Sequence, residues 1–234
     1  MAQVFVENRD AAMPMFRKWS LRDLKELEVS LRNWHGELAD DRFVLFYLDM
    51  LVETTNMREN IVIVDPLNVG VCVAATSRDR GCEALRESLE ATRALYDGPV
   101  KLVIVPLNYS VHWSLLVYFA HSDRWYHYDS IPGSSHRSYA KRFLDICHTG
   151  GILHGNLTRA HTQIDDTPVI SVQQEGWECG TYMLMYVMEL VRNYSTGFAP
   201  LCREDESNCN NARMYRHMWP WMKAVLKIAR DNIR

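Results

Sequence analysis

Three runs rich in β-branched and aromatic residues follow one another in the middle of the chain and constrain its fold more than any other feature. They are residues 101–107 (KLVIVPL), 112–119 (HWSLLVYF) and 124–129 (RWYHYD). Runs of this length and composition predict β-strands. Residues 121–123 (HSD) are typical of a turn, so we expect the second and third strands to pair antiparallel.

Helical patterns lie on both sides of these strands. Residues 21–31 carry leucines three or four positions apart, and residues 41–52 are apolar on nearly every face, with Asp40 as a potential N-cap. Further signals are those for helices at 83–96, 138–147, 179–193 and over about the last 25 residues, and for short strands at 61–64 and 169–172. This order predicts an α+β fold. We expect one domain over residues 21–234, preceded by a loose arm at 1–20.

Charge and composition exclude several classes of function. The chain has 234 residues and a net charge of −3, which gives no basic surface for nucleic acid. Its apolar runs are far shorter than the ~18 residues that suggest a membrane span. Residues 1–10 lack the pattern of a secretory signal, and no CxxC pair suggests a metal site. We therefore expect an intracellular protein, cytoplasmic or nuclear and monomeric, without metal or cofactor.

Cys179 is a candidate nucleophile because of its surroundings. It lies between Gly176 and Gly180 and precedes a long apolar segment, so it is expected at the start of a helix. Unpaired N–H groups and the dipole at a helix N-terminus favour a thiolate. The alternative is structural, since a cysteine before an apolar helix is often a small buried hydrophobe.

His112 and Asp129 are candidates for a base and the carboxylate that orients it. If residues 121–123 form the turn of a hairpin, residues near 112 lie beside residues near 130. Asp129 would then fix the tautomer of His112 and stabilise its cation, while His112 would take the proton of Cys179. A slip of one residue in register would place the two side chains on opposite faces. In the structural alternative Asp129 merely ends a strand as a turn residue.

Acyl chemistry also needs a donor for the developing oxyanion. Gln173 and Gln174 lie just upstream of Cys179, so an amide N–H₂ from this pair and the backbone N–H of Cys179 are the candidate donors. A solvated loop is the structural alternative.

The segments HWSLLVY, HYDS and QQxxxxCG, in this order, resemble those of the cysteine proteases specific for ubiquitin-like proteins. These are the SUMO proteases and the deneddylase, and the first two segments are most similar to the deneddylase branch. The resemblance implies a papain-like fold with a central, mostly antiparallel sheet flanked by helices. It implies a triad of His112, Asp129 and Cys179, with Gln173 in the oxyanion hole. It also implies that Trp113 covers the Gly-Gly tail of the modifier.

The resemblance is weaker near the N-terminus. The family carries Trp-Leu-Asn-Asp before a buried helix, where this chain has Glu37, Leu38, Ala39 and Asp40. Leu38 and Asp40 match, which implies substrate-binding roles for them. The family's tryptophan, the other lid of the glycine tunnel, is replaced by Glu37. We expect Trp34 to supply the missing ring from a shifted position.

The resemblance implies a thiol isopeptidase or endopeptidase that cleaves after the C-terminal Gly-Gly of a ubiquitin-like modifier, for deconjugation or precursor processing. Its partner would be the neddylation modifier or SUMO and their conjugates. Two alternatives remain open at this point. One is an acyltransferase or maturation protease with the same His–Asp–Cys order, and the other is a catalytically weak module that binds a modifier without cutting it.

Overall fold

The computed structural model describes most of the predicted domain and none of residues 1–19. The described residues are 20–33, 39–54, 60–74, 82–83, 85–86, 100–150, 164–165, 173, 176–193, 201, 223 and 226–227. The predicted arm, the predicted strand at 169–172 and nearly all of the predicted C-terminal helix lie outside them. Of the predicted helix at 83–96, only residues 83, 85 and 86 are described, and all three are helical.

Helices precede and follow a central set of strands, as the sequence predicts. The described helices are α3 (Leu21–Asn33), α4 (Asp41–Thr54), α5 (Pro66–Ala74), α7 (His136–Thr149) and α8 (Cys179–Arg192). The described strands are β1 (Ile61–Ile63), β2 (Leu102–Tyr109), β3 (His112–Phe119), β4 (Arg124–Tyr128) and β5 (Ile164–Asp165).

The five strands form one mixed sheet in the order β1-β2-β3-β4-β5. The pairs β2–β3 and β3–β4 are antiparallel, whereas β1–β2 and β4–β5 are parallel. The predicted hairpin around residues 121–123 is confirmed, with Leu115 opposite Tyr128. The sheet is thus antiparallel at its centre and parallel at both edges, and only the centre was expected.

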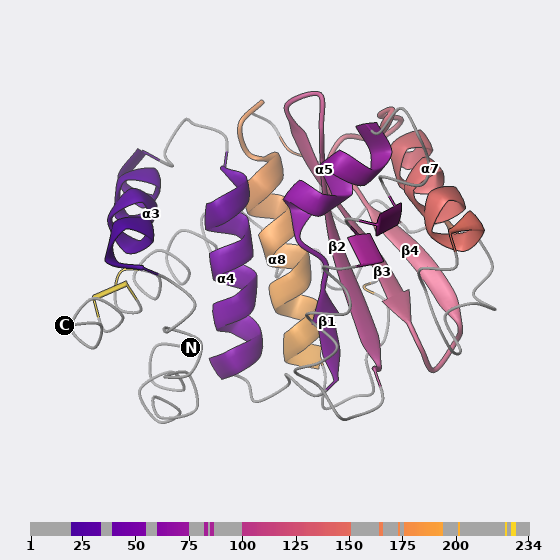
Figure 1. Cartoon of the computed structure of the whole chain (residues 1–234), viewed down its shortest axis with the longest axis horizontal. Helices are drawn as coiled ribbons and strands as arrows, with labels where there is room; N and C mark the ends of the chain where they lie inside the picture. The colour runs from indigo at the N-terminus through magenta and orange to yellow at the C-terminus, as the bar shows by residue number, and fades with distance from the viewer. Residues whose placement is uncertain are drawn as a thin grey trace.

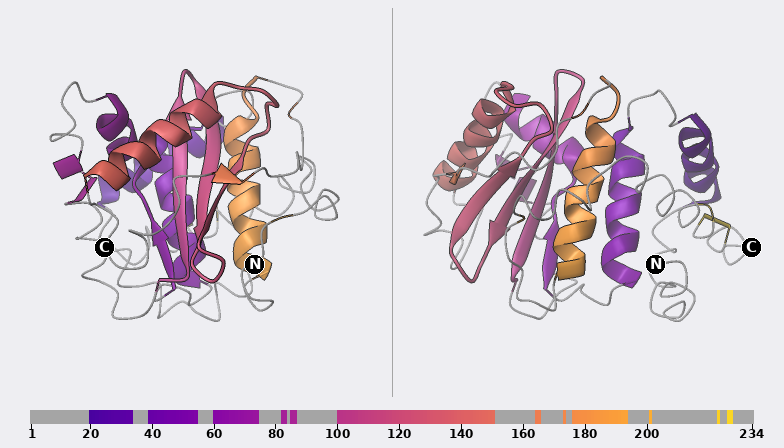
Figure 2. Two further views of the ribbon diagram at one scale, coloured as in Figure 1. Left: turned by 90° about the vertical axis from the view of Figure 1, so that its right-hand side faces the viewer. Right: turned by 180° about the vertical axis from the view of Figure 1, so that it is seen from behind.

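Helices cover both faces of the sheet, so most residues on both faces of the central strands are apolar. Leu115, Val117 and Phe119 point into one core with residues of α4 and α8. Leu116 and Tyr118, which alternate with them, point into a second core with residues of α5 and α7. Figures 1 and 2 show the resulting three layers, with α4 and α8 side by side on one face and α5 and α7 on the other. Every residue of β3 is buried.

Local signals explain two of the helix starts. The Asp40 side chain accepts a hydrogen bond from the backbone N–H of Phe43 at 2.7 Å, which confirms Asp40 as the N-cap of α4. Ser20 and Asp23 exchange side-chain and backbone hydrogen bonds at the start of α3, in the pattern of a capping box. Both helices therefore begin where the polar residue precedes the apolar repeat.

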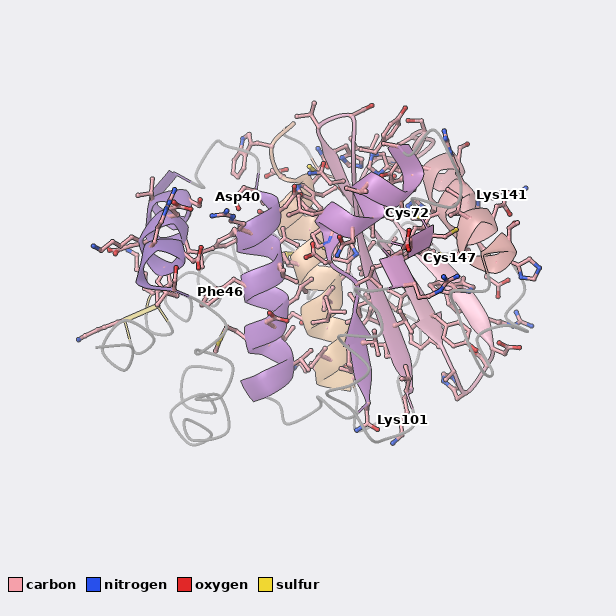
Figure 3. The ribbon with its side chains drawn as sticks, viewed as in Figure 1. Asp40, Phe46, Cys72, Lys101, Lys141 and Cys147 are labelled. Atoms are coloured by element: carbon pink, nitrogen blue, oxygen red, sulfur yellow. The ribbon has the colours of Figure 1, made fainter. Side chains whose placement is uncertain are left out.

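The turn between β2 and β3 lies at the same end of the sheet as the starts of α4 and α8 (Figure 1). Figure 3 shows Asp40 at this end and Lys101, just before β2, at the opposite end. Ser110 and Val111 form the turn with positive φ angles of 50° and 63°. None of the helices that the structure describes combines the length and the hydrophobicity of a membrane span.

Candidate active site

The β3–β4 hairpin brings His112 and Asp129 together, as the position of its turn predicts. His112 is the first residue of β3, and Asp129 directly follows the last residue of β4. The Nε2 atom of His112 lies 2.7 Å from Oδ1 of Asp129. Both side chains are largely removed from solvent, with 10% and 12% of their surfaces exposed. The pairing that sequence alone left dependent on register is therefore present.

Asp129 is held in its ionised form by several donors. Besides His112, the backbone N–H of Ile131 donates to its Oδ1 at 2.8 Å, and the Ser134 hydroxyl donates to its Oδ2. Burial opposes ionisation, but the hydrogen bonds from His112, Ser134 and Ile131 together keep the pKa of Asp129 below its ordinary value. Asp129 therefore presents a fixed negative charge to the imidazole.

Cys179 approaches the same imidazole from the other side of the sheet. It is the first residue of α8, and its side chain is buried. Burial works against a charged His112, but hydrogen bonds with Asp129 and Cys179 outweigh it and raise the pKa of His112 to about 9. Since Nε2 faces Asp129, Nδ1 is the ring nitrogen left for the sulfur. An imidazole in this position can hold the thiol proton, which is what a sulfur nucleophile requires.

Gln173 lies beside the residue that follows Asp129. Its amide Oε1 accepts a hydrogen bond from the Ser130 hydroxyl at 2.6 Å, and its backbone N–H donates to the Ser130 carbonyl at 3.1 Å. The hydrogen bond from Ser130 orients the amide and distinguishes its oxygen from its N–H₂ end. This is the end that an oxyanion would need.

Trp113 contacts Ala39, the residue before Asp40, and lies close to Gly180 at the start of α8. Its indole N–H donates to the carbonyl of Ala39 at 2.8 Å, and only 2% of the residue is exposed. A Cβ atom at Gly180 would lie 2.7 Å from the Cβ of Ala39 and 3.3 Å from Cδ1 of Trp113. The contact of 2.7 Å could form only if the backbone moved, so glycine at 180 allows this close packing next to Cys179.

Both oxygens of Asp40 already have partners within the chain. Oδ1 caps α4, and Oδ2 accepts a hydrogen bond from the Ser30 hydroxyl. A substrate-binding role for Asp40 therefore stays a prediction beside a structural role that is observed. Leu38, Trp34 and Glu37 lie outside the described residues, so the predicted second wall of a glycine tunnel remains a prediction too.

The other described cysteines lie away from His112. Cys72, Cys82 and Cys147 are all buried, and Figure 3 shows Cys72 on α5 and Cys147 on α7, in the layer that faces away from α8. Burial raises the pKa of Cys72 to about 11 and also raises that of Cys147. Burial without a basic partner leaves these two thiols protonated and unreactive.

The described residues also bear on metal binding and on cavities. No group of three or more His, Cys, Asp or Glu side chains among them could hold a metal ion. A cavity of about 630 Å³ lies between α5, the end of β2 and α7, lined in part by Tyr109, Ser135 and Arg142. Its lining includes neither His112 nor Cys179, so it does not contain these candidate catalytic residues.

Sequence reasoning missed several polar residues that support the site. Ser130 and Ser134 contact Gln173 and Asp129, and Ser114, His127 and His136 form a buried cluster behind His112. A signal for two of them was present. Ser114 and His127 are polar residues inside strands that are otherwise apolar on both faces, where a polar group must have a buried partner.

A carboxylate, an imidazole and a cysteine at the start of a helix are the three groups that cysteine proteases use. A sequence model of the Ulp1 protease family, C-terminal catalytic domain, matches residues 43–218. This is more than half of the chain, so the chain belongs to the Ulp1 family, whose members are cysteine proteases that act on ubiquitin-like proteins.

One relative and several solved structures are similar to the chain. NEDD8-specific protease 1 of Arabidopsis thaliana is 23% identical over 167 residues, which cover 68% of this chain and 67% of the relative. The SUMO protease Ulp1 superposes with a TM-score of 0.59 at 13% identity, covering 92% of this chain and 97% of that structure.

The Ulp1-like SUMO protease domain of Chaetomium thermophilum gives a TM-score of 0.51 at 16% identity, covering 91% of this chain and 88% of that one. At these identities the structures support the fold alone, and that fold is α+β, as predicted.

Proposed function

We propose that this chain is a papain-like thiol protease that cleaves after the C-terminal Gly-Gly of a ubiquitin-like modifier, in conjugates, in precursors or in both. One observation carries the proposal, namely that His112 lies between the Asp129 carboxylate and Cys179. The relative named NEDD8-specific protease 1 favours a deneddylase over a SUMO protease. A Ulp1 protease domain has been solved in complex with SMT3, a yeast SUMO, which supports a folded modifier as the partner.

In the proposed reaction, His112 takes the proton of Cys179, and the thiolate attacks the carbonyl carbon of the last glycine. The negative charge moves to the carbonyl oxygen, where the N–H₂ of Gln173 and the backbone N–H of Cys179 stabilise it. His112 then gives its proton to the departing amine, and a thioester remains. Water, deprotonated by His112, attacks the thioester and releases the modifier and the thiol. Asp129 stabilises the imidazolium in both halves of the cycle.

Trp113 would cover the Gly-Gly tail from one side, and Leu38, Asp40 and Trp34 would complete the substrate-binding surface. Glycines fit this role because a tail without side chains passes beside an indole to a buried thiol. A free thiolate also needs a reducing compartment. The proposal therefore places a monomeric enzyme in the cytoplasm or nucleus.

Two alternatives make different demands on the same site. An acyltransferase would pass the acyl group to a protein amine or hydroxyl, and nothing in the described residues favours that acceptor over water. A module that only binds a modifier has no need for Asp129 to be held by three donors. The complete hydrogen-bond set around Asp129 therefore favours catalysis.

The test uses modifiers with an electrophilic group at the C-terminus. SUMO, the neddylation modifier and ubiquitin probes are incubated in parallel with the wild-type chain and with Cys179→Ala. We expect one covalent adduct at Cys179, formed fastest with the neddylation modifier, and none with the variant. Binding without an adduct would favour the binding module, and labelling at another cysteine would overturn the site.

A further inference from the structure

A second group of buried polar side chains lies directly behind the candidate base. Ser114, His127 and His136 are exposed by 1%, 5% and 2%, and none of them has a role in the proposed reaction. The Ser114 hydroxyl lies 2.8 Å from Nδ1 of His136 and 3.0 Å from Nε2 of His127. Nε2 of His136 lies 2.7 Å from the backbone carbonyl of Tyr109. The four groups form one continuous hydrogen-bonded chain.

The carbonyl at one end fixes the direction of every hydrogen bond in this chain. A carbonyl oxygen only accepts, so Nε2 of His136 carries a proton. In the neutral ring Nδ1 is then an acceptor, and it takes the single hydroxyl proton of Ser114. The Ser114 oxygen is left to accept from Nε2–H of His127. The three hydrogen bonds of this chain are therefore consistent with one arrangement, in which both histidines are neutral Nε2–H tautomers.

The surroundings of His136 favour this neutral form. His136 is the first residue of α7, and the positive end of a helix dipole disfavours a cation. The groups that face the ring are Tyr109, His112, Asp129 and Tyr139. Burial is the largest influence and, together with His112, lowers the pKa of His136 despite the Tyr109 carbonyl and Asp129. Burial likewise lowers the pKa of His127 to about 4.

His136 touches each part that orients the candidate base. Its ring meets that of His112 edge to face, with centroids 4.5 Å apart and planes at 75°. Its backbone N–H donates at 3.1 Å to the Ser134 hydroxyl, which in turn donates to Asp129. Tyr109, which accepts from its ring, is the strand partner of His112. His136 thus joins the hairpin, the Asp129 loop and α7 at one point.

We propose that His136 is a positioning residue for His112. Hydrogen bonds with the Tyr109 carbonyl and the Ser114 hydroxyl hold the His136 ring neutral, and this ring packs against the His112 imidazole and keeps it aligned. This inference rests on the proposed function for its kinetic consequence only. A neutral ring can lie against the His112 imidazolium without repelling it, whereas a charged ring in the same place would oppose the charge that the reaction needs.

The first test needs no activity. The full chain labelled with ¹⁵N-histidine is titrated between about pH 6 and pH 8, and two-bond ¹⁵N–¹H correlations report the tautomer of each ring. Single histidine variants assign the signals. We expect His127 and His136 to keep the neutral Nε2–H pattern throughout, with His112 doubly protonated over most of the range. An Nδ1–H tautomer or a protonated ring at His136 would overturn the proposal.

The second test separates positioning from packing. His136→Phe keeps a ring but loses both hydrogen bonds, and Ser114→Ala removes one oxygen from the middle of the chain. A displacement of about 1 Å can cost roughly 10²-fold in rate, so we expect each variant to lose about 10- to 10²-fold in kcat with KM unchanged. Because the chain acts as a unit, the double variant should be no slower than His136→Phe.

His148→Phe, an exposed site on the same helix, is the matched control and should retain full kcat. Wild-type kcat in Ser114→Ala would contradict the proposal, as would losses that multiply in the double variant. If His136→Phe does not fold, Ser114→Ala carries the kinetic test alone. A wild-type chain that cleaves no modifier would sink the proposed function, while the tautomer measurement would still decide whether His136 is held neutral.

Discussion

The two sides of the candidate site are built by different physical means. On one side, His112, Asp129 and Gln173 are held by hydrogen bonds that Ser134, Ser130 and backbone groups complete. We call this the polar wall. On the other side, Trp113, Ala39 and Gly180 bring the Cys179 helix close through contacts that leave no room for one more carbon atom. We call this the packed wall.

The two walls are sensitive to different kinds of substitution. A hydrogen-bonded group fails when one atom is changed, even if its volume is kept, because an unmatched buried donor or acceptor is costly. A packed group fails when volume is added, even if no polar atom is touched. Isosteric changes should therefore reduce turnover at the polar wall, and added volume should reduce stability at the packed wall.

The largest effect is expected where the two walls meet. Cys179→Ala should abolish turnover, because it removes the proposed thiolate nucleophile. With limiting iodoacetamide near neutral pH, peptide mapping should find the adduct at Cys179. Cys147, whose thiol pKa is raised by burial, should stay unmodified, and Cys147→Ala should keep its activity. Preferential labelling of Cys147 would refute the assignment.

Asp129→Asn changes one atom of the polar wall and keeps its shape. The amide can hold the wrong tautomer of His112, so kcat should fall by on the order of 10²- to 10⁴-fold while circular dichroism stays unchanged. Asp165→Asn is the matched control, since Asp165 pairs with Arg124 on the far strand edge. Equal rates in the two variants would mean that Asp129 only ends a strand.

Gln173→Ala should cost about 10²- to 10³-fold in kcat if its amide faces the oxyanion. Ser130→Ala, which frees the Gln173 amide to turn, should cost roughly tenfold, the size of one hydrogen bond. The double variant should be no slower than Gln173→Ala. Steady-state kinetics decide this, with Ser122→Ala in the β3–β4 turn as control. Multiplying losses would show that Ser130 acts independently of Gln173.

Gly180→Ala tests the packed wall. The new Cβ would lie 2.7 Å from the Cβ of Ala39. We expect the free energy of unfolding to fall by about 1–3 kcal/mol, measured by urea denaturation. Gly176→Ala, where the new atom would meet nothing within 4 Å, should be close to neutral. Ala39→Gly in the Gly180→Ala background should restore stability, and no rescue would place the strain elsewhere.

A further effect is a pH dependence of the free energy of unfolding, which Asp129→Asn should weaken. The pKa of His112, about 9 in the folded chain, lies above its ordinary value of 6.5. Its protonated form therefore stabilises the fold fully below pH 6.5, and this contribution is lost as pH rises through about 9. Urea unfolding at several pH values should show the wild-type advantage over the variant shrinking across that window. An advantage that grows with pH would contradict the sign.

Helices and strands with a clear pattern of apolar residues could be predicted from the sequence. The elements that were missed are short. The β3–β4 hairpin and α8 follow from apolar strand runs, a polar turn and a long apolar repeat. The helix α5 was missed because it has nine residues, is apolar on most faces and contains Gly70. The two-residue strand β5 was missed because only its partner β4 defines it.

The candidate catalytic residues could be selected from the sequence, whereas the residues that hydrogen-bond to them could not. Cys179 has flanking glycines and a helix start, and the distance from His112 to Asp129 suits a hairpin. Ser130 and His136 carry no such mark, since their partners Gln173 and Ser114 are remote in sequence. Such contacts depend on the directions of the side chains, and the spacing of residues in a single sequence does not reveal these directions.

The buried alternation along β3 has a mechanical consequence. His112 and Ser114 face the layer that contains α7, while Trp113 faces the layer that contains α8 and Cys179. His112 therefore faces the α7 side of the sheet, whereas Cys179 belongs to the layer on the other side. The rate of the proposed reaction should therefore depend on how these two layers are aligned. A change of solvent or pressure, or a binding event, could shift one layer by a fraction of an ångström. Such a shift should lower the rate before either layer unfolds.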